Sequence, residues 1–253
     1  MQTVFGYIQL FDFNAQHLTF IFLIFIWSGF VRSGLGFGGA ALALPLLLLI
    51  YDRPLFWLPI LCVHLLVFTT LTLRTRLNNV DWGVLKKTSI YILPGKLIGV
   101  FGLLSLPNRW LIIIIYGITL FYAFLWVLNL RIRSEKGWTD KLLLAMGGYF
   151  SGASLMGAPL MVAVYMHQIN KQSLRDSLFV LWFILVGIKL GTLAAFGVNL
   201  QFLSALILVP VAGIGHVAGL KAHEYMLKND GYFRQILGVI LIGISVIGLG
   251  SLL

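Results

Sequence analysis

Charged residues are scarce in this chain, and acidic residues are the scarcest of them. They make up 10% of the 253 residues, with 8 acidic against 18 basic, whereas 60% of the chain is hydrophobic. A soluble domain is about 25% charged and about 45–50% apolar. The composition therefore excludes a soluble globular protein and predicts an all-α, multi-pass membrane protein. The net charge of +10 then reports on topology, so we expect a lipid bilayer and no nucleic acid as partner.

The patterns that catalysis or cofactor binding would need are also missing. A single cysteine, Cys62, excludes an internal disulfide and a cysteine-based metal cluster. The sequence holds no H-E-x-x-H motif, no paired carboxylates in an apolar segment and no P-loop. The first sixteen residues carry no Lys or Arg, so a cleavable signal peptide is not expected. We therefore expect no enzyme, no cofactor, no metal and no drive by ATP.

Two apolar stretches, 17–50 and 141–169, are each interrupted by small residues. The first is too long for one span and too short for two, because 34 helical residues reach about 51 Å and one span needs about 30 Å. Its interruption at 32–39 is rich in glycine, which weakens a helix by about 1 kcal/mol per residue relative to Ala. The second stretch is broken at 151–159. Each stretch is therefore interpreted as a hairpin of two half-helices.

Three further apolar segments follow each hairpin. We expect an N-terminal repeat over 1–135 and a C-terminal repeat over 136–253. The expected spans are 55–73, 89–106 and 110–130 in the first repeat, and 174–196, 202–220 and 233–252 in the second. The two breaks also match at a constant offset of 118 residues, which indicates an internal duplication. The matched residues are Gly29 with Gly147, Ser33 with Ser151, Gly34 with Gly152, Gly39 with Gly157 and Ala40 with Ala158.

The distribution of basic residues favours one topology. If both hairpins are re-entrant, each repeat crosses three times, the repeats are inverted, and four loops share one side. These loops hold 13 of the 18 Lys and Arg residues, which the positive-inside rule places in the cytoplasm. If both stretches cross fully, the chain has eight spans and two of these loops move to the other side. The loops are 74–88, 131–141, 167–175 and 221–234.

The motifs around the two breaks resemble the sulfite exporter TauE/SafE family. G-F-G-G-A-A-L-A-L-P at 36–45 carries this resemblance, with its echo S-G-A-S-L-M-G-A-P at 151–159. P-G-K-L-I-G-V-F-G at 94–102 and P-V-A-G-I-G-H-V-A-G at 210–219 add to it. The family's second motif usually reads G-G-P where this chain has G-A-P, which bears on substrate choice. The resemblance implies a permease of the bacterial cytoplasmic (inner) membrane that moves sulfite, organosulfonates or related small anions.

Three cations, Arg32, Lys96 and Lys189, fall inside apolar segments that lack a clear acidic partner. Such cations are costly unless they snorkel, lose a proton or meet an anion, so the imbalance predicts an anionic substrate. Arg32 could equally bind helix-end carbonyls, and Lys96 could snorkel to the basic side, whereas Lys189 lies deeper in its span. His64 and His216 are candidates for proton coupling, with packed neutral histidines as the alternative.

The backbone at the two interruptions supplies the other groups that are expected to bind the anion. A half-helix that begins at Gly39 or Gly157 directs free N–H groups and a positive dipole end towards an anion. Close packing of helices is the alternative explanation for the glycines, and serines in membrane helices often bond to their own backbone. The expected substrate-binding set is Arg32, Ser33, Gly34, Gly38, Gly39, Ala40, Lys96, Ser151, Ser154, Gly157, Ala158 and Lys189.

These observations predict a secondary transporter that exports a small anion. The tips of the two hairpins would meet near the middle of the membrane, as in other transporters built from inverted repeats with broken helices. A passive anion channel and a non-transporting membrane assembly subunit are the alternatives. The sequence leaves open the exact anion, the coupling ion and whether the chain forms a homo-oligomer.

Overall fold

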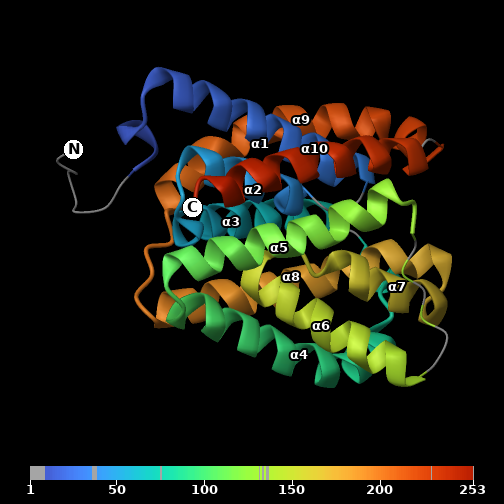
Figure 1. Ribbon diagram of the computed structural model, residues 1–253. Helices are drawn as coiled ribbons and strands as arrows, with labels where there is room; N and C mark the ends of the chain where they lie inside the picture. The colour runs from blue at the N-terminus through green and yellow to red at the C-terminus, as the bar shows by residue number, and fades with distance from the viewer. Residues whose placement is uncertain are drawn as a thin grey trace.

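The computed structural model describes residues 9–35, 39–74, 76–130, 132, 134, 137–228 and 230–252. Throughout these residues the chain is helical, without a strand, which confirms the all-α prediction (Figure 1). Two short 3₁₀ turns, Leu10–Asp12 and Leu77–Asn79, accompany the α-helices. The α-helices are α1 Ala15–Leu35, α2 Gly39–Ile50, α3 Pro54–Leu73, α4 Trp82–Ser105, α5 Asn108–Val127, α6 Gly137–Ser154, α7 Ala158–Gln168, α8 Lys171–Ala195, α9 Phe202–Lys228 and α10 Asp230–Gly250.

Seven helices of the described chain are long and apolar enough to cross a membrane, namely α1, α3, α4, α5, α8, α9 and α10. The protein is therefore a multi-pass membrane protein. Helix α4 begins seven residues before the expected position 89, because the carboxylate of Asp81 caps it by accepting from the Val84 N–H at 3.0 Å. Helix α3 is the most buried of the seven, which agrees with its sequence being apolar on every side.

Each interrupted stretch contains two helices, α1 and α2 in the first and α6 and α7 in the second, but their limbs are unequal. Helix α1 continues through the expected start of the first interruption at 32, and residues 36–38 lie outside the described residues. Helix α1 has 21 residues and is long enough to span, whereas α2 has 12. Likewise α6 has 18 residues and α7 has 11. The expectation of two half-helices therefore describes α2 and α7 better than it describes α1.

Each short limb packs closely against the long limb that precedes it. A Cβ atom on Gly39 would lie 2.4 Å from the carbonyl oxygen of Ser28, and one on Gly157 would lie 2.0 Å from that of Gly147. Only glycine permits approaches this close. Leu155, the first residue after α6 ends at Ser154, adopts a left-handed backbone with φ of 65°, a conformation that terminates helices. The second break is thus built into the backbone on both of its sides.

The long limbs pack against helices from the other half of the chain. Helix α1 lies along α9, and α6 lies along α4, while α3 contacts α8 and α5 contacts α10 (Figure 1). Glycines allow the backbones to touch at both long-limb contacts. A Cβ on Gly215 of α9 would lie 1.8 Å from the Ile26 oxygen of α1, and one on Gly148 of α6 would lie 2.2 Å from the Ile92 oxygen of α4. The two halves are therefore interlocked and do not stand side by side.

Candidate functional site

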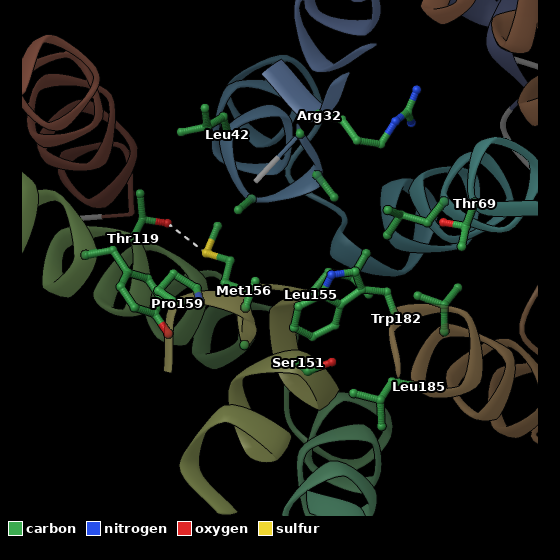
Figure 2. A pocket seen from close by; sticks show the side chains of 18 of the residues that line it. Arg32, Leu42, Thr69, Thr119, Ser151, Leu155, Met156, Pro159, Trp182 and Leu185 are labelled. Carbon is green, nitrogen blue, oxygen red and sulfur yellow. Dashed lines mark hydrogen bonds between the residues drawn. The ribbon is translucent and has the colours of Figure 1, made fainter. Parts of the chain in front are cut away.

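A cavity of about 70 Å³ lies where the two short limbs begin (Figure 2). We call it the central cavity. Its wall is mostly apolar, with Leu42, Leu155, Met156 and Trp182 among the contributing side chains. The polar side chains that border it come from α1, α3, α5 and α6, and none of the described residues in its lining is acidic. These polar residues are Arg32, Thr69, Thr119, Tyr122 and Ser151.

The starts of α2 and α7 both border the central cavity. Gly39 and Ala40 open α2, and Gly157 and Ala158 stand at the start of α7. The first N–H groups of a helix have no partner inside the helix, and no side chain caps α7, whose N-cap residue is Gly157. The structure therefore brings together the four backbone positions that the sequence singled out. Helix starts of this kind are favourable positions for an anion.

Arg32 stands between the central cavity and a second, larger cavity of about 370 Å³, which we call the vestibule. Its guanidinium lies over the ring of Phe68, with Cζ 3.9 Å from the ring centroid. Figure 2 shows the side chain pointing away from the middle of the central cavity. The side chain is only 9% exposed, and its Nη2 atom has no hydrogen-bond partner among the described residues. Arg32 is thus a buried cation with an unused donor.

Lys96 and Lys189 line neither the central cavity nor the vestibule. Both are fully buried and bind the last turn of α6. Lys96 donates from Nζ to the carbonyl and the hydroxyl of Ser151, each at 3.0 Å, and Lys189 donates to the Gly152 carbonyl at 2.6 Å. The last carbonyls of a helix lack partners within it and favour a positive charge. The structure therefore shows both lysines engaged with the end of a broken helix.

The serines and histidines fall into different places. Ser33 donates to the Gly29 carbonyl at 3.0 Å and pairs with Nδ1 of His216, and both residues line the vestibule. Ser154 is fully buried and donates back to the Phe150 carbonyl at 3.0 Å. His64 lies in the core, with Nε2 2.8 Å from the Ala205 carbonyl.

The remaining glycines divide between the break and the helix contacts. Gly34 is buried in the last turn of α1 and lines neither cavity. Gly38 lies outside the described residues. Gly29 packs against α9, where an added Cβ would lie 2.1 Å from the Ala212 oxygen, so close packing explains this glycine.

Three hydroxyl residues of the central cavity were absent from the expected set. Thr119 donates to the Ile115 carbonyl at 2.7 Å and contacts the Met156 sulfur at 3.5 Å (Figure 2). The hydroxyl of Tyr122 is buried and lacks a partner among the described residues. Thr69 borders both cavities. The spacing of three residues between Thr119 and Tyr122 places them on one face of α5, and that was the available signal.

The described residues thus form a multi-pass helical bundle of the membrane, with a cavity where α2 and α7 begin whose described lining includes a cation and no acidic residue. A family model described as Sulfite exporter TauE/SafE matches residues 21–247. The chain therefore belongs to the sulfite exporter TauE/SafE family, as its motifs predicted. No curated protein and no solved structure matches it.

Proposed function

We propose that this protein is a secondary transporter that exports sulfite, an organosulfonate or a related small anion across the cytoplasmic membrane. In this proposal the anion occupies the central cavity, between the starts of α2 and α7. The observation that carries the proposal is the meeting of these two helix starts at one cavity without an acidic side chain in its lining. An inside-negative membrane potential would itself drive an anion outward.

The proposed site binds the anion through several kinds of donor. The backbone N–H groups at Gly39–Ala40 and Ala158 supply donors, and the Tyr122 hydroxyl, which lacks a partner among the described residues, supplies a side-chain donor. Lys96 and Lys189 act indirectly, because they hold Ser151 and Gly152 at the end of α6. The apolar wall around Met156 and Trp182 suits the carbon portion of an organic sulfonate. Proton coupling, if present, falls to His216, which faces the vestibule, and not to His64, which is packed in the core.

The proposed mechanism is alternating access between two inverted repeats, with the basic loops in the cytoplasm. The packing of each long limb against a helix of the other repeat supports it. The 118-residue correspondence relates α1 to α6 and α9 to α4, so the pair α1–α9 is equivalent to the pair α6–α4. The contacts of α3 with α8 and of α5 with α10 each join an element to its own counterpart, as a two-fold relation requires. Movement of one hairpin relative to the other would then open the cavity to alternate sides.

Flux measurements in proteoliposomes test this function. The purified chain should carry radiolabelled sulfite or a small sulfonate at a rate that saturates with concentration. A rate that stays linear, together with single-channel conductance, would establish a passive channel instead. A chain that moves none of these anions would contradict the proposal.

A matched pair of tyrosines on α5 tests the location of the site. Tyr122→Phe removes a buried hydroxyl that has no partner among the described residues, so affinity should fall about fivefold while stability is unchanged. Tyr116→Phe is the control, because its hydroxyl donates to the Pro45 carbonyl at 3.1 Å and does not line the cavity. This control should lower stability and leave affinity unchanged. The reverse pattern would place the anion elsewhere.

A further inference from the structure

The vestibule lies where α3 ends and α8 begins, next to the expected cytoplasmic loops. It has a volume of about 370 Å³, more than the central cavity, and it reaches the central cavity at Arg32, Thr69 and Phe179, which border both. Helices α1, α3, α8 and α9 contribute to its wall. Its lining residues are Arg32, Ser33, Phe68, Thr69, Leu71, Thr72, Arg76, Arg175, Phe179, His216 and Leu220.

Three arginines, Arg32, Arg76 and Arg175, face this one cavity. In the part of the chain that the structure describes, no ion pair joins any of them to a carboxylate. The nearest acid in sequence, Asp176, does not line the vestibule, and its Oδ2 accepts from Asn79 at 3.3 Å. Like charges gathered around a cavity repel one another. The buried Asp176 carboxylate beside Arg175 offsets part of this repulsion, and an anion in the vestibule would offset more.

Arg32 supplies the second indication of a ligand. Its guanidinium is buried against Phe68, it lines the vestibule, and its Nη2 has no partner among the described residues. An unpaired charged donor inside a protein is costly. A planar guanidinium matches an oxyanion that offers two oxygens at once. The missing partner is therefore chemically defined as a small anion with several oxygen atoms.

We propose that the vestibule is a second anion-binding site, separate from the central cavity, that takes a small multi-oxygen anion from the cytoplasmic side. Arg76 and Arg175 attract the anion at the mouth of the vestibule, and Arg32 binds it at the boundary with the central cavity. Arg32 is thus a residue of the vestibule, through which the substrate passes first. The order of the two sites rests on the proposed export function, whereas the binding itself does not.

Binding of radiolabelled sulfate to the purified full chain in nanodiscs of zwitterionic lipid tests the proposal. The double variant Arg76→Gln/Arg175→Gln should weaken sulfate binding about tenfold, because two charge-assisted contacts are lost. The control is Lys86→Gln/Lys87→Gln, which removes the same charge from two exposed residues near the start of α4 that line neither cavity. This control should change affinity less than twofold. Equal losses in both variants, or no loss in the first, would overturn the proposal.

A further variant tests Arg32 by itself. Arg32→Lys keeps the charge and loses the planar fork, so it should also weaken sulfate binding. Both arginines of the double variant are at least partly exposed, and an unchanged Tm confirms that it folds. If the wild type binds sulfate through Arg76 and Arg175 but transports nothing, the export proposal fails and the vestibule stands. If transport is normal and independent of both arginines, the vestibule proposal fails and the export proposal stands.

Discussion

The two broken hairpins have similar sequences at their breaks, yet their long limbs end in different surroundings. The end of α6 is bound by two buried lysines from α4 and α8. The end of α1 receives no lysine; it carries Arg32, which borders two cavities and keeps an unpaired donor. A cation in an apolar segment therefore has two distinct uses here. Those at the second hairpin bind a helix end, and the one at the first keeps a donor without a described hydrogen-bond partner beside two cavities.

The largest expected change in Tm comes from the close backbone contacts that the long limb of each hairpin makes, α1 with α9 and α6 with α4. Gly215→Ala places a Cβ 1.8 Å from the Ile26 oxygen, and Gly95→Ala places one 2.1 Å from the Ala145 oxygen. Each should cost about 3 kcal/mol or more, which lowers Tm by roughly 10 °C in a chain of this size.

Each of these glycines has a control on its own helix. Gly213 has nothing within 4 Å of an added Cβ, and Gly102 has only the tip of Leu106 at 4.0 Å. Alanine at these positions should leave Tm unchanged or raise it slightly, because alanine favours a helix. Equal behaviour of Gly213→Ala and Gly215→Ala would show that α1 does not pack on α9 as described.

The lysines should matter more for stability than Arg32 does. Lys96→Met removes the buried donor to both oxygens of Ser151. The carbonyl still accepts from the Leu155 N–H at 3.2 Å, so the cost is about 1–3 kcal/mol for the hydroxyl, partly offset by the apolar side chain. Lys189→Met removes one such bond and should cost less. Arg32→Met removes no described hydrogen bond and should change Tm least. Thermal unfolding of these three variants in detergent decides the order. If Arg32→Met lowered Tm most, Arg32 and not the lysines would be the cation that stabilises a hairpin.

The end of α1 is bound by a neutral hydroxyl, that of Ser33, and by no lysine of the described chain. Removing this hydroxyl should therefore lower Tm less than removing a lysine does. Ser33→Ala removes the bond to Gly29 and the pairing with His216, at about 1 kcal/mol or roughly 2–4 °C in Tm. Ser154→Ala is the matched control in α6, because Ser154 only bonds back to its own helix. Scanning calorimetry should separate the two variants. Indistinguishable Tm values would mean that the contact with His216 contributes nothing.

The smallest expected change in Tm concerns Asp140, at the base of the second hairpin. Burial raises the pKa of Asp140, but hydrogen bonds from Ser134 and Gln168 and the charge and hydrogen bond of His167 outweigh it, so the pKa lies below its ordinary value. A lowered pKa stabilises the fold above the ordinary value, and the benefit disappears as the pH falls through the folded-state pKa. Asp140→Asn should therefore lower Tm by about 1–2 °C at pH 7.

The pH dependence distinguishes a charge effect from a loss of packing. The difference in Tm between the wild type and Asp140→Asn should shrink below about pH 4 and vanish once Asp140 is protonated in the folded state. A difference that persists unchanged at pH 3 would show that the carboxylate charge does not hold the base of α6 to the end of α7.

Much of the fold was predictable because the relevant signals are local. Apolar length predicted the spans, and runs of small residues predicted the breaks near Gly39 and Gly157. Helix ends were less predictable: α4 starts early because Asp81 caps it, a contact the hydropathy pattern does not contain. The inverted relation of the repeats stays a prediction, which the exchange of α1 and α6 supports.

The sequence by itself determined that this is a multi-pass helical membrane protein of the TauE/SafE family with two interrupted helices, since composition and small-residue motifs depend only on neighbouring positions. Only the tertiary structure decided which buried cations face a cavity. Lys96 and Lys189 meet Ser151 and Gly152 across 55 and 37 residues of chain, and Arg32 meets Phe68 across helices. Such partners are brought together by the packing of backbones through glycine, and no local pattern encodes which donor is left free.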